Sequence, residues 1–358
     1  MQFGFYTPGQ VTTVGSPEIA RQIEEALQPL PLGVKDAQFG ICEQITMAAD
    51  EAGFDLALYA ERHLGTDISA WIMAGAIGAR MKNMRALVAV HPGLWSPAMI
   101  AKLAASVDRI CDRRMGINIV NGWYEEEFNM FGGVVLQGDE RYRRSAEFIH
   151  LLRRLWTEDF VTHHGEFYQL DNAHLPLRPA SAEPPEIFSV SSTEPGREFI
   201  ANTCDWWFIG APKAPETTHD DLMRSLEASV KNMDRRAREL GRKVHFAFNP
   251  FVSIGNTTQE ALDDAVEKIF AYDKDPGNRS SDRTRQIERR MLPATKAGLM
   301  GRAEDICKQV KRFEDIGLEL LLIKFIPTVE NVRRIGEQVI SQVGSRASSA
   351  SNYTTAGV

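Results

Sequence analysis

Three polar side chains stand beside apolar runs of the chain, and their types suit acid–base and binding chemistry. His63 and His91 each follow a run of apolar residues, and an imidazole transfers protons near neutral pH. Asn118 interrupts the apolar run Gly116–Val120, and a buried amide is costly unless it is hydrogen-bonded. We therefore expect His63, His91 and Asn118 to be catalytic. A loop ion cluster, an incidental histidine and a satisfied core asparagine are the alternative interpretations.

Two further segments suit a phosphate group. Asp139, Arg141 and Tyr142 open a helical pattern, where Asp139 can cap the helix and the other two offer a guanidinium and a phenol. The segment Ser191–Thr193 offers hydroxyls and free amides at the next helix start. Each segment alone is compatible with an ordinary helix start. Because they follow neighbouring predicted strands, we expect both to converge on one phosphate.

Aromatic residues gather at or near the ends of the predicted strands. Some must belong to the core, but enough lie beside loops to line a flat apolar slot. Such a slot suits a planar cofactor or substrate. The residues are Phe5, Trp71, Trp95, Trp123, Phe131, Trp206, Trp207, Phe248, Phe251 and Phe325.

Strands that alternate with helices must position these groups. We predict eight strands, the number that closes a (β/α)8 TIM barrel, in which ligands bind at the carboxyl ends of the strands. A doubly wound open sheet is the alternative, although no Gly-x-Gly-x-x-Gly follows an early strand. The predicted strands are Gln2–Tyr6, Leu56–Tyr59, Arg85–His91, Gly116–Val120, Glu186–Val190, Trp206–Ile209, His245–Val252 and Leu318–Phe325. The predicted helices span about 36–52, 68–80, 97–112, 140–156, 194–203, 215–240, 257–271, 303–316 and 328–342.

Three inserted segments exceed a minimal barrel. Residues 8–35 form a long loop, and residues 158–185 resemble a small hairpin with a proline-rich linker. Residues 273–299 form a long connection that contains several arginines, among them Arg285. Loops of this length in a compact domain are usually functional or disordered. The position of the 273–299 connection before the last strand predicts a lid over the ligand site.

The composition is that of a globular protein, with 43% hydrophobic and 25% charged residues among 358. We predict one barrel domain over 1–343 and a disordered tail over 344–358. The net charge of -7 provides no basic surface for nucleic acid, and no apolar run is as long as a membrane span. Without a leader pattern, we expect a cytoplasmic protein. The four cysteines lack metal-ligand spacing, which favours buried thiols and predicts no metal site.

Four blocks of sequence carry a family resemblance. They are GFDLALYAERH at 53–63, HPGLWSP at 91–97, MGINIVNGWYEEEF at 115–128 and DERYRRSAEFIHLLRRLW at 139–156. Over roughly residues 1–340 the chain resembles the bacterial luciferase-like flavin monooxygenases, especially the reduced-flavin branch of alkanesulfonate, dimethylsulfone and pyrimidine monooxygenases. The resemblance implies a luciferase-like barrel that binds FMN at its mouth, receives FMNH2 from a separate NAD(P)H:flavin reductase and activates O2.

The resemblance also implies which residues contact the flavin. Arg141, Tyr142 and the hydroxyl segment would bind the phosphate, and Asn118 would face the ring or the ribityl chain. The full set of cofactor-binding residues that it implies is Glu61, Arg62, Asn118, Glu127, Arg141, Tyr142, Ser191, Ser192 and Thr193.

The chain departs from the alkanesulfonate enzymes at positions that bear on the substrate. Their active-site cysteine position falls near Asp67, and the Arg and His of their seventh strand fall near Asn249 and Phe251. These changes favour a small apolar or aromatic organic substrate, whose oxygenation could end in C–S cleavage, ring opening or dehalogenation. The substrate contacts that we expect are Trp95, Trp123, Phe248, Phe251 and Arg285.

Two other functions are compatible with the same fold. The first is an F420-dependent oxidoreductase that transfers hydride without O2, although the block around Asn118 and the Arg141–Tyr142 pair favour FMN. The second is a non-catalytic flavin-storing relative, which the complete set of loops at the strand ends disfavours. The resemblance further implies a homodimer or homotetramer.

Overall fold

The computed structural model describes residues 1–8, 30, 32–33, 36–60, 63, 68–112, 114–122, 125–180, 183–210, 217–272 and 295–343, without the side chains of 268–272. The predictions for Glu61, Arg62, Trp123 and Arg285 lie outside these residues, as do those for most of the lid and for the tail.

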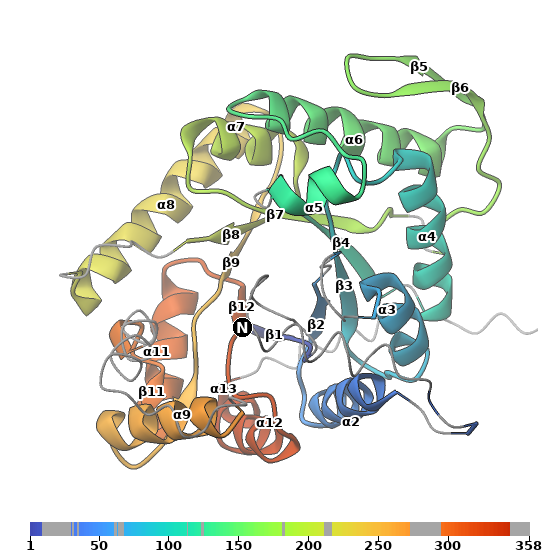
Figure 1. Ribbon diagram of the computed structural model, residues 1–358. Helices are drawn as coiled ribbons and strands as arrows, with labels where there is room; N and C mark the ends of the chain where they lie inside the picture. The colour runs from blue at the N-terminus through green and yellow to red at the C-terminus, as the bar shows by residue number, and fades with distance from the viewer. Residues whose placement is uncertain are drawn as a thin grey trace, which may run out of the picture.

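Eight parallel strands close into a barrel in the order β1-β12-β9-β8-β7-β4-β3-β2 (Figure 1). The predicted TIM barrel is therefore confirmed, and the open sheet is wrong. Between successive strands the chain returns along helices on the outside. The strands are β1 Gln2–Tyr6, β2 Leu56–Tyr59, β3 Arg85–Val90, β4 Met115–Ile119, β7 Glu186–Val190, β8 Trp206–Ile209, β9 His245–Phe248 and β12 Leu320–Ile323.

Three strands are shorter than predicted: β3 ends one residue early, at Val90, and the other two are shortened for local reasons. We predicted the seventh strand of the barrel to reach Val252, but β9 ends at Phe248. Pro250 lacks the N–H that a continued ladder needs, although its carbonyl still accepts from the amide of Lys324 at 2.7 Å. We predicted the last strand from Leu318, but Leu318 N–H instead closes the end of the preceding helix by donating to the carbonyl of Phe313 at 3.0 Å.

The helices surround the barrel. The helix of residues 125–130 was not predicted, and the last helix passes through one π-helical turn, η1 Gly336–Ile340. The α-helices of the described residues are α2 Ala37–Glu51, α3 Ala70–Gly78, α4 Pro97–Ile110, α5 Glu125–Met130, α6 Glu140–Thr157, α7 Glu194–Thr203, α8 His219–Glu239, α9 Thr258–Tyr272, α11 Ala303–Asp315, α12 Val329–Ile335 and α13 Ser341–Val343.

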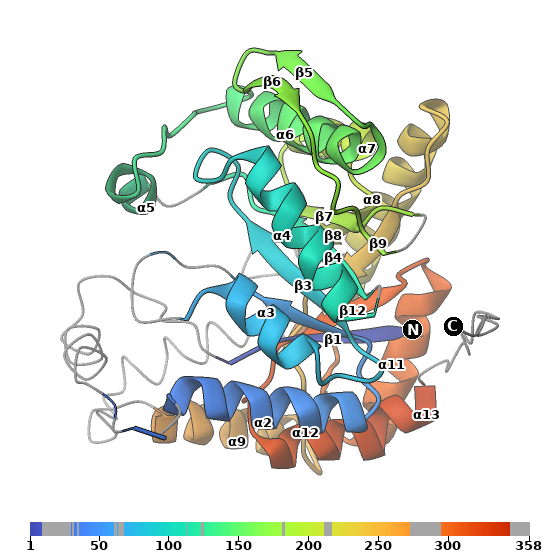
Figure 2. The same cartoon turned by 90° about the vertical axis from the view of Figure 1, so that its right-hand side faces the viewer.

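Short sheets lie outside the barrel. The predicted hairpin is confirmed as β5 Val161–His164 paired with β6 Gln169–Ala173, which lies beside α6 in both views (Figures 1 and 2). The carboxylate of Glu147 on α6 accepts backbone N–H groups of the hairpin and holds it in place. A second pair joins β10 Ser253–Ile254 to β11 Met300–Gly301.

Alternation along the strands sorts side chains into two layers. Leu56, Leu87 and Leu322 are among the residues that fill the inside of the barrel. Their strand neighbours, such as Ala57 and Ile323, pack between the barrel and the helices. A polar side chain on the inner face therefore lies either in this interior or at one of its two ends.

The amino-terminal end of the barrel is closed by a polar network. Arg85 contacts the carboxylate of Glu186 and donates to Gln2 Oε1 at 2.9 Å. Trp206 Nε1 donates to Glu186 Oε1 at 3.0 Å, and the ring of His245 stacks on Trp206. Figure 2 shows the N-terminus at this end of the barrel and α5 at the other.

The thiols are mostly buried, as predicted. Cys42, Cys111 and Cys204 are buried, whereas Cys307 is only half-buried and was predicted to be fully so. Burial raises the pKa of Cys42 and Cys111 to about 11 and that of Cys204 to about 12. Within the described ranges, no group of three or more His, Cys, Asp or Glu is arranged to hold a metal ion. No helix in these ranges is long and apolar enough to cross a membrane.

Candidate active site

Polar groups gather at the carboxyl ends of the barrel strands, which we call the mouth. In TIM barrels this end holds the active site. At the mouth, the structure forms three groups from residues far apart in sequence. They are a hydroxyl cluster (Tyr142, Ser191 and Thr193), a histidine pair (His63 and His91) and a lysine trio (Tyr6, Asn249 and Lys324).

The hydroxyl cluster joins the start of α6 to the loop after β7. Tyr142 Oη lies 3.1 Å from Ser191 Oγ and 2.8 Å from Thr193 Oγ1, and these two oxygens are 3.2 Å apart. Arg141 Nη2 donates to Tyr142 Oη at 3.1 Å, and the guanidinium carbon lies 4.8 Å from the centre of the tyrosine ring. The expected convergence of the two helix starts is confirmed.

The electrostatics of the cluster favour a negative charge. Burial alone raises the pKa of Tyr142, but hydrogen bonds from Ser191 and Thr193 and the charge of Arg141 outweigh it and lower that pKa. The same donors would stabilise a bound oxyanion. Arg141 Nε is buried and has no hydrogen-bond partner within the described part of the chain.

The start of α7 brings backbone close to the cluster. Thr193 is the N-cap of α7, and its hydroxyl accepts from the amide of Gly196 at 3.3 Å. A Cβ on Gly196 would lie 1.9 Å from Ser191 Oγ and 2.8 Å from Tyr142 Oη. Only glycine therefore fits here. Trp207 Nε1 fixes the loop by donating to the carbonyl of Ser191 at 3.1 Å. Hydroxyls, a guanidinium and helix-start amides in one place fit a phosphate.

Two residues of the predicted phosphate segments lie apart from the cluster. The side chain of Ser192 is exposed, and its carbonyl accepts from Arg197 Nη1 at 3.1 Å. Asp139 stands at the N-cap position of α6, but its side chain makes no capping hydrogen bond. Its backbone already has helical angles (φ -81, ψ -19), whereas a capping residue is extended. The predicted cap is wrong.

Asn118 lies on the inner face of β4. Its neighbours Ile117 and Ile119 pack outward against the helices, so the amide points into the barrel. The residue is buried, and its Oδ1 has no hydrogen-bond partner among the described residues. Such an orphaned acceptor is costly unless a ligand completes it. The Oδ1 of Asn121 nearby is also buried without a hydrogen-bond partner among the described residues, while its Nδ2 donates to Ser189 Oγ at 3.4 Å.

The histidine pair occupies a neighbouring part of the mouth. The ring centres of His63 and His91 are 5.7 Å apart, and His63 also lies 6.0 Å from the ring of Trp95 and 5.3 Å from that of Phe131. Glu127 is buried on α5, and its Oε1 accepts from the backbone amide of His63 at 3.2 Å. In this structure Glu127 thus positions the histidine loop.

Arg144, which sequence reasoning did not select, ties the loops of the mouth to α6. Its Nη1 donates to the carbonyl of Val134 at 2.6 Å, and its guanidinium lies 5.5 Å from the ring of Phe128. Gly93 has φ +101, and a Cβ there would lie 2.4 Å from the Arg144 guanidinium carbon. Buried arginines that bind backbone carbonyls are not visible as such in a sequence.

The lysine trio was also missed. Asn249 Nδ2 donates to Tyr6 Oη, and Lys324 Nζ lies 5.4 Å from the centre of the Tyr6 ring. The three come from the ends of β1, β9 and β12. The polar residue Lys324 directly after an apolar strand was the signal that could have found them.

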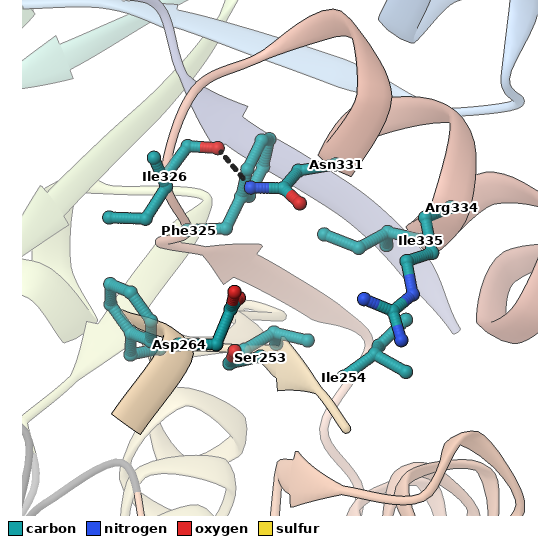
Figure 3. Close-up of a pocket in the computed structure, with 10 residues that line it drawn as sticks. Ser253, Ile254, Asp264, Phe325, Ile326, Asn331, Arg334 and Ile335 are labelled. Atoms are coloured by element: carbon teal, nitrogen blue, oxygen red, sulfur yellow. Dashed lines mark hydrogen bonds between the residues drawn. The ribbon is translucent and has the colours of Figure 1, made fainter. Parts of the chain in front are cut away.

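The aromatic residues that were predicted to contact the substrate lie in different parts of the structure. Trp95 lies beside His63, but Phe248 packs outward against Phe313 of α11, with ring centres 5.6 Å apart. Phe251 lines a hollow with Asp264 and Arg334, outside the barrel wall between α9 and α12 (Figure 3). The side chains of Phe248 and Phe251 are therefore outside the barrel interior, although the backbone of Phe251 pairs with that of Lys324.

The sequence profile of the luciferase-like monooxygenases matches residues 1–320. A dimethylsulfone monooxygenase of Pseudomonas fluorescens (strain Pf0-1), named as FMNH2-dependent, is 29% identical over 338 residues, covering 88% of this chain and 90% of that protein.

Solved structures share the fold at lower identity. A long-chain alkane monooxygenase superposes with a TM-score of 0.70 at 13% identity, over 95% of this chain and 90% of the other. An F420-dependent secondary alcohol dehydrogenase superposes with a TM-score of 0.66 at 16% identity, over 96% and 97% of the two chains.

Proposed function

This chain belongs to the luciferase-like monooxygenase family, and from that membership we propose that it is an FMNH2-dependent monooxygenase of a small organic substrate. The observation that carries the proposal is the hydroxyl cluster beside the start of α7. It provides a phosphate site at the family's catalytic end of the barrel. The name of the FMNH2-dependent relative supports FMN over F420.

The residues present fit FMN. Arg141, Tyr142, Ser191 and Thr193 would hold its phosphate, with the amides of the first turn of α7. The orphaned Oδ1 of Asn118 would accept a hydrogen bond from the ring or the ribityl chain. Reduced FMN, when bound, supplies the two electrons with which O2 places one oxygen atom in the substrate and the other in water.

The protein's own part is to orient, to exclude water and to move protons. His63 and His91 stand where they can exchange a proton with substrate or water, and Glu127 fixes the loop that carries His63. Trp95 and Phe131 supply the apolar surface beside them. If His63→Gln and His91→Gln both kept wild-type turnover and pH profile, this proton role would be lost.

The supply of reduced flavin follows from the same proposal. A separate NAD(P)H:flavin reductase would provide FMNH2. C–S cleavage, ring opening and dehalogenation are the outcomes that oxygenation of a small substrate would allow.

Anaerobic titration of the purified chain with FMNH2 and with reduced F420 tests the cofactor. We expect saturable binding of FMNH2 and weaker or no binding of F420. Loss of FMNH2 binding in Arg141→Ala would locate it at the hydroxyl cluster. Preference for F420, or FMNH2 binding that ignores Arg141, contradicts the proposal.

A further inference from the structure

The lysine trio lies on the inner face of the mouth. In β12, Leu322 faces the barrel interior and Ile323 packs outward, so alternation turns Lys324 inward. Tyr6 packs against the same interior layer. The backbone holds the neighbouring segments together, since Lys324 N–H donates to the carbonyl of Pro250 at 2.7 Å. Three separate strands thus bring these polar groups to one place.

The contacts within the trio leave donors available. Because Asn249 Nδ2 donates to the Tyr6 hydroxyl oxygen, the Tyr6 O–H remains free to donate elsewhere. The ammonium of Lys324 contacts the face of the Tyr6 ring, which holds the cation without using its N–H groups. The trio therefore presents an ammonium and a phenolic O–H side by side.

The positive charge of Lys324 is not balanced locally. No carboxylate forms an ion pair with Lys324 within the described ranges, whereas the guanidiniums of Arg141 and Arg144 at the mouth each donate to an oxygen of the protein. The protein around the ammonium lowers its pKa through loss of hydration. Its side chain nevertheless remains accessible to solvent, so a small ligand can reach it. A bound anion would stabilise the ammonium in place of the water that it has lost.

The place of the trio separates it from the flavin phosphate. In the ring of strands, β12 is four strands from β4 in either direction, so Lys324 stands across the mouth from Asn118. The hydroxyl cluster follows β7, on the Asn118 side. An FMN that spans the hydroxyl cluster and Asn118 leaves the wall of β1, β9 and β12 to the substrate.

We propose that Lys324 and Tyr6 bind an oxyanion on the substrate, a carboxylate in the simplest case. The inference rests on the proposed function, and it narrows the apolar or aromatic substrate expected from the sequence to one that carries an anionic head. Asn249 positions the Tyr6 hydroxyl, and the ammonium of Lys324 favours an anionic substrate over a neutral one. Lys324 is thus a specificity-determining residue.

Calorimetric titration of the chain saturated with FMN tests this assignment, because FMN fills the phosphate site. The probes are acetate and benzoate, each paired with its neutral amide, acetamide or benzamide. We expect at least one carboxylate to bind about tenfold or more tightly than its amide. Lys324→Met and Lys324→Gln should abolish that preference, and Lys324→Arg should keep part of it. Lys231→Met, on the exposed face of α8, is the control and should change nothing.

FMN affinity and melting temperature are measured for the same variants. These two measurements distinguish failure of the Lys324 assignment from failure of the proposed function. Unchanged melting and FMN affinity in Lys324→Met show that the mouth is intact. A wild-type chain that binds FMN but shows no preference for either carboxylate overturns the Lys324 assignment alone. So does a preference that survives in Lys324→Met. Failure of the wild-type chain to bind the flavin, either as FMN or as FMNH2, contradicts the proposed function instead.

Discussion

At the scale of single residues, the mouth combines groups that no single segment of sequence contains. Tyr142 meets Ser191 and Thr193 across 49 and 51 residues of sequence. Two potential phosphate segments could be recognised from their residue types, and their convergence followed from the barrel. The lysine trio was harder to find, because a lysine after an apolar strand is a weak signal on its own and Tyr6 comes beside Lys324 only when β1 and β12 pair.

The phosphate assignment predicts a loss of FMN affinity and a change in its pH dependence. Arg141→Ala should weaken FMN binding by about 1.5–3 kcal/mol, the worth of a hydrogen bond to a charged group. The pKa of Tyr142 is lowered, so its phenol ionises below the usual value of about 10. Ionisation removes a donor and repels the phosphate, so affinity should fall as pH rises through that lowered pKa.

Fluorescence titration with FMN between neutral and alkaline pH measures both effects. In Tyr142→Phe the alkaline loss assigned to the phenol should vanish, while affinity at neutral pH should already be reduced. If both variants bound FMN as the wild type does at every pH, the phosphate would lie elsewhere.

Asn118 should affect how much product forms for each FMNH2 oxidised, and it should not affect folding. Asn118→Leu removes the orphaned amide from the inner face of β4 and replaces it with an apolar group of similar size. We expect an intact barrel, less product per FMNH2 oxidised and more hydrogen peroxide released. Asn202→Leu on the exposed side of α7 is the control. Full product yield in Asn118→Leu would remove this residue from the mechanism.

At the scale of elements, apolar runs placed most strands and helices correctly, because buried parallel strands are nearly continuous in apolar residues. Four of the predicted strands match the structure to the residue, those at Gln2–Tyr6, Leu56–Tyr59, Glu186–Val190 and Trp206–Ile209. The errors had local causes, such as Pro250 at the end of β9. The short helix α5 was missed because six residues rich in glutamate carry too little periodicity.

The start of α7 gives a prediction about an element. A Cβ added at Gly196 would overlap Ser191 Oγ and crowd Tyr142 Oη, so Gly196→Ala must displace the hydroxyl cluster. We expect FMN affinity to fall more than tenfold, by roughly the 1.4 kcal/mol or more that this represents, while the far-UV spectrum stays unchanged. Gly40→Ala on α2 meets no atom within 4 Å and should bind FMN normally. Normal binding in Gly196→Ala would contradict the close approach of phosphate to this helix.

At the scale of the whole molecule, the two ends of the barrel have different tasks. The mouth holds the hydroxyl cluster, the histidine pair and the lysine trio. The opposite end holds the network of Arg85, Glu186 and Trp206. TIM barrels typically place catalytic residues at the carboxyl ends of the strands and residues that stabilise the fold at the opposite end.

Breaking the network should therefore change stability alone. Arg85→Met leaves Glu186 without its cation and Gln2 without its donor, which should lower the free energy of unfolding by about 1–3 kcal/mol. FMN affinity should not change. Denaturant unfolding of this variant is compared with Arg224→Met, an exposed residue on α8 whose loss should cost less than about 0.5 kcal/mol. Reduced FMN affinity with unchanged stability in Arg85→Met would contradict this division.

The chain is proposed to use FMNH2 and O2 to oxygenate a substrate. The most direct measurement supplies the purified chain with FMN, NADH, a flavin reductase and ¹⁸O₂, and screens small sulfur-containing and aromatic compounds, with and without a carboxylate, by product mass. We predict a product that contains one ¹⁸O atom, formed only when the chain and the reductase are both present. A chain that binds no FMNH2, or that turns over its substrate with reduced F420 and without O2, would contradict the claim.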